Sequence, residues 1–289
     1  MTDFTKQHNY LVAFDSDGCV FDTMELKHKE CFIPNIIKYY HLQAVSKYAR
    51  EAAEFVNLYS KSRGINRFPA LIETLEWLAK RPEVIARGVN VEVPPALRDW
   101  VSKETKLGNP ALKQAVQSAG DPVLTHALKW SEAVNDDVTA MVENVPPFPK
   151  VRECLEKLAG VADMIVCSAT PTKNLELEWR EHGIESYVAG RIYGQEAGTK
   201  KEILRLAPRY GADKVLMVGD APGDYQAAKA NNCLFYPINP GAEEVSWERL
   251  HNEALDRFLT GAYAGQYQEG LLREFESYLP ERPKFAVLS

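Results

Sequence analysis

The stretch FDSDGCVFD, residues 14–22, places three carboxylates directly behind the apolar run 10–14. Like charges repel one another, and burial makes such crowding more costly. The crowding is explained if a cation binds among the carboxylates, or if one acid is kept protonated for a chemical step. The plain alternative is an acidic turn that caps a helix, because Asp and Thr favour such positions. The rest of the chain has to decide between the two.

Asp15 and Asp17 carry the first candidate chemistry, in the pattern D-x-D-G. An aspartate can attack phosphorus and form an aspartyl-phosphate, which divides one difficult displacement into two easier ones. A second acid two residues further on could protonate the leaving oxygen and later deprotonate the attacking water. We therefore expect Asp15 to be the nucleophile and Asp17 the general acid and base.

Two later segments could hold an anionic group. Ser168 follows an apolar run in VCSATP, where its hydroxyl and the backbone N–H of Ala169 could bind a phosphoryl group. Lys200 in GTKKEIL could neutralise the charge of that group and of the nucleophile. Lys201 competes for this role, but Lys200 fits the register Lys-x-Glu-Ile-Leu better.

The segment GDAPGD supplies two more carboxylates, those of Asp220 and Asp224. Proteins typically bind Mg²⁺ through one or two carboxylates together with water and phosphate oxygens. Asp15 and Asp220, at the ends of neighbouring strands, would provide such ligands. Asp224 is interpreted either as a support of the metal site or as an acceptor of hydrogen bonds within the turn.

Short apolar runs, each followed by a turn and a helical pattern, must position these residues. They span residues 10–14, 164–167, 215–219 and 233–238, with 187–194 as a further candidate. Strands separated by helices, without hairpin turns, indicate a Rossmann-like parallel α/β sheet with helices on both faces. In such sheets reactive groups gather beyond the carboxyl ends of the strands, where the polar residues of this chain also stand.

The interval between the first two runs is far longer than one crossover helix requires. Its apolar residues recur at helical spacing, so we expect an all-helical cap domain over residues 23–145. VPPFPK marks its end, since prolines favour an extended linker. Residues 1–22 and 146–289 would form the Rossmann-like core, with a C-terminal helical tail at about 241–289.

Composition and charge narrow the classes of function. The 289 residues are 45% hydrophobic and 26% charged, which is typical of a soluble globular protein. The net charge of −6 argues against nucleic-acid binding, and no run reaches the roughly 20 apolar residues of a membrane span. Five scattered cysteines without CxxC spacing, and no signal peptide, indicate a cytoplasmic protein with reduced thiols.

Taken together, D-x-D-G, a Ser at a strand end, Lys-x-Glu-Ile-Leu and G-D-x-x-x-D resemble the haloacid dehalogenase-like hydrolase superfamily, and within it the phosphoglycolate phosphatase and β-phosphoglucomutase-like branch. The resemblance implies a Mg²⁺-dependent phosphatase that hydrolyses a small-metabolite phosphomonoester through an aspartyl-phosphate. The implied roles are these: Asp15 as nucleophile and metal ligand, Asp17 as acid/base with its carbonyl on the metal, Ser168, Ala169 and Lys200 as phosphate-binding residues, and Asp220 and Asp224 at the metal.

Two features depart from the usual pattern of that superfamily. Cys19 stands where Thr is usual, and the inserted cap is longer than usual. A thiol is a weaker hydrogen-bond partner than a hydroxyl, so a contact at the helix start could be lost while the chemistry survives. Within the cap, Gly64-Ile65-Asn66-Arg67 resembles a G-x-x-R loop that contacts substrate in β-phosphoglucomutase-like members. Arg67 and Lys27 are the candidate substrate contacts, with a solvated helix face as the alternative for each.

Three functions follow as hypotheses. The first is a phosphatase of a small phosphorylated metabolite, acting as a monomer or homodimer without a nucleic-acid or membrane partner. The second, suggested by the G-x-x-R loop, is a phosphosugar mutase of the β-phosphoglucomutase type. The third is a catalytically silent binding protein with the same fold, against which the intact pair Asp15 and Asp17 argues.

Overall fold

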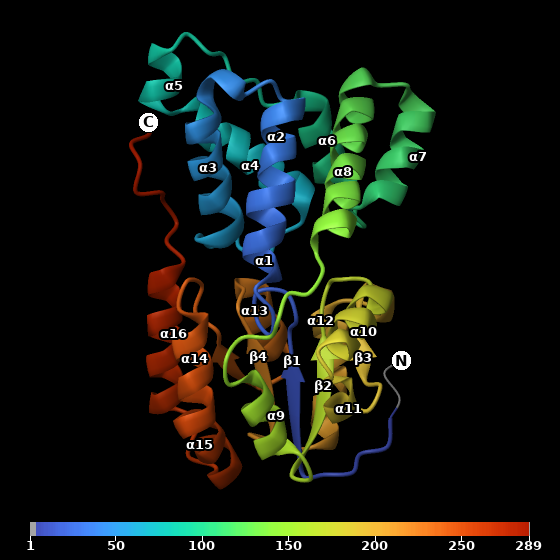
Figure 1. Cartoon of the computed structure of the whole chain (residues 1–289), viewed down its shortest axis with the longest axis vertical. Helices are drawn as coiled ribbons and strands as arrows, with labels where there is room; N and C mark the ends of the chain where they lie inside the picture. The colour runs from blue at the N-terminus through green and yellow to red at the C-terminus, as the bar shows by residue number, and fades with distance from the viewer. Residues whose placement is uncertain (1–3, 289) are drawn as a thin grey trace. The chain divides into compact units, whose positions relative to one another are not determined.

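A parallel five-stranded sheet forms the core of the computed structural model, which describes residues 4–288 (Figure 1). Residues 1–3 and 289, which were predicted to belong to this core, lie outside the described residues. The order of strands is β3-β2-β1-β4-β5, and the predicted parallel α/β fold is confirmed. The strands are β1 Tyr10–Phe14, β2 Ala162–Cys167, β3 Ile192–Tyr193, β4 Val215–Gly219 and β5 Leu234–Pro237.

The central position of β1 follows from its composition. β1 pairs with β2 on one side and with β4 on the other, so Phe14 lies level with both Val166 and Val218. The four residues Leu11–Phe14 are completely buried, as expected of an apolar run covered on both faces. Connections run from β1 towards β3 on one side and from β4 to β5 on the other. The direction in which successive strands are added to the sheet therefore reverses between β1 and β4. In open α/β sheets, ligands bind at such a point of reversal.

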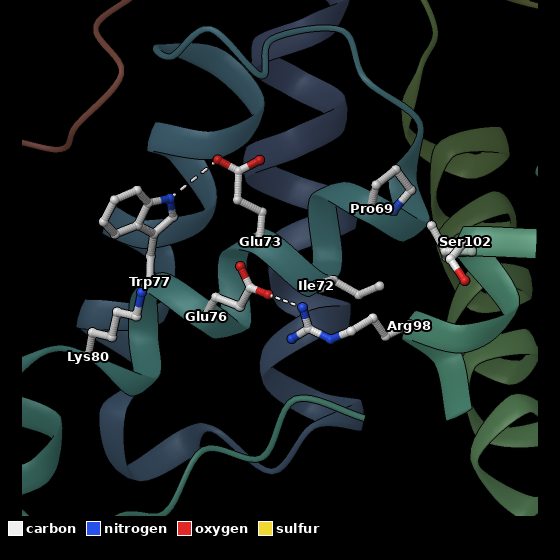
Figure 2. Close-up of a pocket in the computed structure, with 9 residues that line it drawn as sticks. Pro69, Ile72, Glu73, Glu76, Trp77, Lys80, Arg98 and Ser102 are labelled. Atoms are coloured by element: carbon white, nitrogen blue, oxygen red, sulfur yellow. Dashed lines mark hydrogen bonds and ion pairs between the residues drawn. The ribbon is translucent and has the colours of Figure 1, made fainter. Parts of the chain in front are cut away.

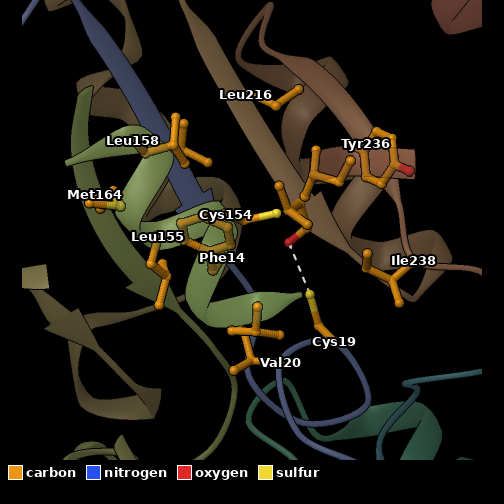
Figure 3. Close-up of a cluster of buried hydrophobic side chains, with 14 of the residues drawn as sticks. Phe14, Cys19, Val20, Cys154, Leu155, Leu158, Met164, Leu216, Tyr236 and Ile238 are labelled. Atoms are coloured by element: carbon orange, nitrogen blue, oxygen red, sulfur yellow. Dashed lines mark hydrogen bonds between the residues drawn. The ribbon is translucent and has the colours of Figure 1, made fainter. Parts of the chain in front are cut away.

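Alternate residues of the strands pack into two separate apolar layers. Phe14, Met164 and Leu216 face one layer, which Figure 3 shows together with Cys154, Leu155 and Leu158 of helix α9 (Val151–Leu158). Leu11, Ala13 and Ile165 face the other layer, where Ile203, Ala228 and Phe275 cover them. Side chains of successive strand residues point to opposite faces, so a continuous apolar run serves both layers.

Helices of the core cover these layers and connect the strands. The helices α9, α10, α14 and α15 contribute to the layer around Phe14, while α12 and α13 contribute to the opposite layer. Their bounds are α9 Val151–Leu158, α10 Thr172–Glu181, α11 Glu185–Val188, α12 Lys200–Ile203, α13 Pro222–Ala230, α14 Glu243–Arg249, α15 Leu255–Thr260 and α16 Gln266–Tyr278.

The chain divides into two compact units. The core unit comprises the chain up to Met24 and residues Glu143–Leu279, and the helical unit comprises Glu25–Val142 and the chain from Pro280 onward. The insert predicted for residues 23–145 is helical, and its ends differ by two or three residues from these divisions (22 against 24, and 146 against 143). Its helices are α2 Ile33–Tyr39, α3 Ser46–Leu58, α4 Arg67–Ala79, α5 Pro82–Ala86, α6 Pro95–Lys103, α7 Asn109–Ala119 and α8 Pro122–Met141, after the short α1 Thr23–Leu26 and a π-helical turn Lys27–Phe32.

Local sequence signals start the helices of this unit. Asn66 and Asp121 cap α4 and α8 by accepting hydrogen bonds from backbone N–H groups of the first turn. Phe68 and Trp130 lie at the centre of the apolar core of the unit, and both are fully buried. In the part of the chain that the structure describes, no helix is both long enough and apolar enough to span a membrane.

The end of the chain corrects the predicted division. Residues 280–288 group with the helical unit and not with the core to which the sequence assigned them. Phe285 packs edge-to-face on Phe55 and lies 4.2 Å from the guanidinium of Arg81. The backbone N–H of Leu288 donates to the Lys80 carbonyl at 2.8 Å. Residues 280–288 are therefore held by aromatic and cation–π contacts with helices that are distant in the sequence. No local sequence pattern predicts such contacts.

We expect Phe285→Ala to lower the free energy of unfolding of the helical unit by about 1–2 kcal/mol, because it removes one aromatic and one cation–π contact. Urea unfolding followed by tryptophan fluorescence measures the effect. Lys284→Ala is the matched control, since Lys284 is exposed and should change stability by less than about 0.5 kcal/mol. Equal effects of the two substitutions would contradict a stabilising contact at Phe285.

Candidate active site

Three predicted site residues meet at the carboxyl edge of the sheet because their strands are neighbours. Asp15 follows β1, Asp220 follows β4 and Ser168 follows β2. The backbone N–H of Asp15 donates to the carbonyl of Val218 at 2.9 Å, which ties the end of β1 to the end of β4. The sheet order thus brings Asp15 together with two residues that are more than 150 positions away in the sequence.

A cluster of three buried carboxylates occupies this edge. One oxygen from each of Asp15, Asp220 and Asp224 lies within 4.8 Å of the others, and the three residues are 5%, 1% and 0% exposed. Buried carboxylate oxygens at this spacing are hard ligands of the kind that Mg²⁺ prefers. Their chemistry and spacing therefore fit a divalent cation, which would also relieve their mutual repulsion.

Asp224 holds its position through the start of α13. Its Oδ2 accepts hydrogen bonds from the backbone N–H groups of Asp220 and Ala221, at 3.2 and 3.1 Å. A Cβ on Gly219 would lie 2.5 to 2.6 Å from the Asp224 side chain, so only glycine allows this close approach. Asp224 therefore accepts the turn hydrogen bonds, and its other oxygen, Oδ1, contacts Lys200 Nζ. Its support of a metal site stays a prediction.

Lys200 provides the positive charge of the site. Its Nζ lies 2.5 Å from Asp15 Oδ2 and 2.5 Å from Asp224 Oδ1. A capping box between Thr199 and Glu202 fixes the start of α12 and with it the direction of Lys200. Lys201, the competing residue, is exposed, and Lys200 is the lysine that contacts Asp15 and Asp224.

The charges of the cluster perturb one another. Burial raises the pKa of Asp15 well above its usual value; Lys200 opposes this rise, and the carboxylates of Asp224 and Asp220 add to it. Burial by itself would lower the pKa of Lys200, but Asp15 and Asp224 raise it, so this amine stays protonated. A divalent cation among the carboxylates would lower the pKa of Asp15 and favour the ionised form that a nucleophile requires.

The Asp17 side chain lies outside the three-carboxylate cluster. Its Oδ2 accepts a hydrogen bond from Thr170 Oγ1 at 2.6 Å, and its Oδ1 accepts one from Thr23 Oγ1. A half-exposed carboxyl held by two hydroxyls suits a group that exchanges protons with substrate. The predicted metal contact of Asp17 through its backbone carbonyl stays a prediction.

The loop after β2 adds a residue that the sequence reading missed. Ser168 is buried, and its Oγ accepts a hydrogen bond from Thr170 N at 3.3 Å, while Ala169 beside it is exposed. Thr170 was overlooked, although a second hydroxyl two residues after Ser168 was a visible signal. Gly194 fixes this loop, because a Cβ there would lie 2.4 Å from the Thr170 carbonyl and 2.5 Å from the backbone nitrogen of Thr172.

Cys19 keeps a hydrogen bond at the position where Thr was expected. Its Sγ donates to the Val218 carbonyl at 3.5 Å, as Figure 3 shows. Burial raises the pKa of this thiol well above its usual value, so it stays protonated. The departure therefore weakens a contact that holds the D-x-D-G loop but does not remove it.

The two cap candidates lie in the helical unit. The Nη1 of Arg67 donates to the Ser131 carbonyl, to Ser131 Oγ and to Asn135 Oδ1 at 2.7 to 3.0 Å, and its guanidinium lies 4.9 Å from the ring of Phe32. Burial lowers the pKa of Arg67 to about 10, and no carboxylate among the described residues pairs with it. Lys27 is half-buried in the π-helical turn.

A pocket of about 450 Å³ opens in the helical unit between α4 and α6 (Figure 2). Trp77 and Ile72 supply its apolar surface, and an ion pair of 2.6 Å joins Arg98 to Glu76 beside it. None of the predicted site residues lines this pocket. It therefore takes no part in the candidate active site.

The sequence of this chain is similar to that of a known family. A family model described as haloacid dehalogenase-like hydrolase matches residues 11–232, more than half of the chain. No curated protein sequence matches closely enough to count as a relative.

Similar solved structures include a haloacid dehalogenase-superfamily hydrolase of subfamily IA from Geobacter sulfurreducens, with 18% identity over 81% of this chain and 90% of that one, at a TM-score of 0.40. A predicted phosphoglycolate phosphatase from Haemophilus somnus shows 17% identity over 80% and 86%, at 0.38. A haloacid dehalogenase-like protein of unknown function from Agrobacterium tumefaciens shows 16% over 94% and 99%, at 0.40.

Proposed function

Because this chain belongs to the haloacid dehalogenase-like hydrolase family, we propose that it hydrolyses the phosphomonoester of a small metabolite through an aspartyl-phosphate on Asp15. The observation that carries the proposal is the contact of Lys200 with both Asp15 and Asp224 at the carboxyl edge of the sheet, beside Asp220. A nucleophile, a cation and two further carboxylates within one buried cluster match the needs of phosphoryl transfer.

In the first step an oxygen of Asp15 forms a bond to phosphorus while the bond from phosphorus to the alcohol oxygen breaks. Asp17 gives its proton to that oxygen, and the alcohol leaves. In the second step water attacks phosphorus and passes a proton to Asp17, and the bond between phosphorus and Asp15 breaks. Ser168 Oγ, the N–H of Ala169 and the Lys200 amine would bind the phosphoryl oxygens during both steps.

Asp15, Asp220 and Asp224 would hold a magnesium ion. Bound there, Mg²⁺ supplies positive charge that reduces the repulsion between an anionic nucleophile and the phosphoryl group. The carbonyl of Asp17 is proposed as a further ligand. The donor set, made only of oxygens, supports this choice of ion over softer metals.

Removal of divalent cations provides a direct test. We expect EDTA to abolish turnover of p-nitrophenyl phosphate and excess Mg²⁺ to restore it, because the anionic nucleophile needs the positive charge of the ion to approach the phosphoryl group. Mg²⁺ should also raise the melting temperature of the wild type but not of Asp220→Asn, since a ligand of the folded state stabilises it. Full activity in EDTA would contradict the magnesium site.

Arg67 favours a substrate with a second anionic group. Its side chain is half-buried without a carboxylate partner among the described residues, and such a cation is stabilised by an anionic ligand. We propose that Arg67, with Lys27, contacts a second phosphate or a carboxylate of the substrate. As the sequence indicated, we propose that the protein acts as a monomer or homodimer and binds neither nucleic acid nor a membrane.

The phosphosugar mutase is the second candidate, and Arg67 in its G-x-x-R loop is the observation that favours it. A panel of phosphate esters, analysed for free phosphate and for isomerised sugar phosphates, separates the two. Free phosphate from one ester supports the hydrolase, and an isomerised hexose phosphate supports the mutase. Tight binding of an ester without turnover in the presence of Mg²⁺ would support the catalytically silent binding protein.

A further inference from the structure

Two buried tryptophans donate their indole N–H groups to the loop 15–19. Trp179 Nε1 donates to Ser16 Oγ at 3.1 Å, and Trp247 Nε1 donates to the Cys19 carbonyl at 2.7 Å. Both tryptophans are 0% exposed, and they come from α10 and α14, which are distant in the sequence. The two acceptors stand on either side of the proposed acid/base in the chain.

Aromatic packing prevents either indole from turning away. Trp179 meets Phe21 edge-to-face, with ring centres 6.2 Å apart and an interplanar angle of 81°. Trp247 stacks on Phe14 at 6.2 Å and 18°. Phe14 ends β1 and Phe21 follows the loop, so each indole is fixed against one end of the segment that it holds.

Ser16 links the hydrogen bond from Trp179 to the side chain of Asp15. Its hydroxyl donates to Glu178 Oε2 at 3.1 Å, so its oxygen is left to accept the N–H of Trp179. Its backbone N–H donates to Asp15 Oδ1 at 2.8 Å, and its carbonyl accepts from the N–H of Val20 at 2.8 Å. A shift of Ser16 would therefore turn the carboxylate of Asp15.

We infer that Trp179 and Trp247 are positioning residues, whose indole N–H groups hold the loop 15–19 at two points and so fix the direction of the Asp15 carboxylate. The inference rests on the proposed function, because it assigns these residues a part in that reaction. Small errors in the placement of a nucleophile cost large factors in rate, so both hydrogen bonds act on turnover as well as on stability. A buried carbonyl or hydroxyl oxygen that loses its donor also makes the loop more mobile.

Trp179→Phe and Trp247→Phe test the inference, since each keeps an aromatic ring and removes the N–H. Each should lower kcat for p-nitrophenyl phosphate by about tenfold with KM within about twofold of wild type. Trp130→Phe is the matched control: Trp130 is also 0% exposed, but its Nε1 has no hydrogen-bond partner among the described residues. It should leave kcat unchanged while lowering the melting temperature.

Ser16→Ala provides a second variant that leaves the packing of Trp179 intact. It removes the acceptor of the same hydrogen bond, so the double variant Ser16→Ala with Trp179→Phe should lose no more activity than the more impaired single variant. Losses that multiply in the double variant would show that the two residues act separately. That result would overturn the part assigned to Trp179.

Hydrogen exchange separates a failure of this inference from a failure of the proposed function. Peptides that cover residues 15–21 should exchange at least about tenfold faster in Trp179→Phe and Trp247→Phe than in wild type, and at the wild-type rate in Trp130→Phe. A wild-type protein without phosphatase activity would refute the proposed reaction. Hydrogen exchange would even then test whether Trp179 and Trp247 restrain the loop 15–19. Unchanged exchange, or equal loss of kcat in all three variants, would overturn the inference.

Discussion

Asp15→Asn is expected to reduce kcat for p-nitrophenyl phosphate by a factor on the order of 10⁴ or more, because an amide oxygen cannot form the aspartyl-phosphate. Steady-state release of p-nitrophenol measures this loss, and phosphate transferred to the protein in a quenched reaction should disappear with it. The position of Asp15, 2.5 Å from Lys200 and within 4.8 Å of the other two carboxylates, is the reason for choosing it as nucleophile.

Asp22→Asn is the matched control for this prediction. Asp22 belongs to the same acidic stretch but is exposed, and it lies outside the carboxylate cluster. It should retain activity within about twofold of wild type. Normal turnover by Asp15→Asn, or equal losses in both variants, would refute the assignment of the nucleophile.

Asp15→Asn should also change the stability of the protein in EDTA. Burial raises the pKa of Asp15 in the folded protein, so its ionised form at pH 7 opposes folding. Asp15→Asn should then melt at a temperature no lower than wild type at pH 7, because Lys200 keeps its ion pair with Asp224. The difference should shrink as the pH falls towards the unfolded-state value of about 3.9, because the carboxyl becomes protonated in both states.

Lys200→Ala is expected to reduce kcat by a factor of about 10³ and to destabilise the metal-free protein by about 3 kcal/mol. The substitution leaves Asp15 and Asp224 buried without their cation, and removal of one partner from a buried pair is costly. The transferring phosphoryl group also loses a positive charge. Turnover at saturating Mg²⁺ and urea unfolding in EDTA measure the two effects.

Lys201→Ala serves as the control, because its side chain lies on the exposed face of the same short helix. It should change stability by less than about 0.5 kcal/mol and leave kcat near the wild-type value. If Lys201→Ala were the more damaging of the two, the register assigned to the Lys-x-Glu-Ile-Leu segment would be wrong. Since Mg²⁺ also neutralises the carboxylates, saturating Mg²⁺ should restore part of the stability of Lys200→Ala but little of its activity.

Local patterns in the sequence predicted the sheet and the residues at its edge. Runs of buried apolar residues mark β1, β2, β4 and β5 within two residues of their observed bounds. Asp15, Ser168 and Asp220 could be placed at strand ends because a parallel sheet aligns the carboxyl ends of its strands. The two-residue strand β3 was less distinct, since so short a strand carries little pattern of its own.

Long-range contacts decided the rest of the molecule. Thr170 bonds to Asp17 across 153 positions, and Trp247 bonds to Cys19 across 228, and no spacing in the sequence indicates such pairs. Residues 280–288 likewise join the helical unit through Phe285, whose partners lie far away in the chain.

The sequence by itself determined which groups could perform phosphoryl transfer and that a parallel sheet would carry them. It could do so because hydrophobic period and turn chemistry are local properties. The tertiary structure alone decided which lysine faces Asp15, what fixes the loop around Asp17, and where the end of the chain packs. Those choices depend on side chains that meet only after the chain has folded, when packing and burial select one partner among many.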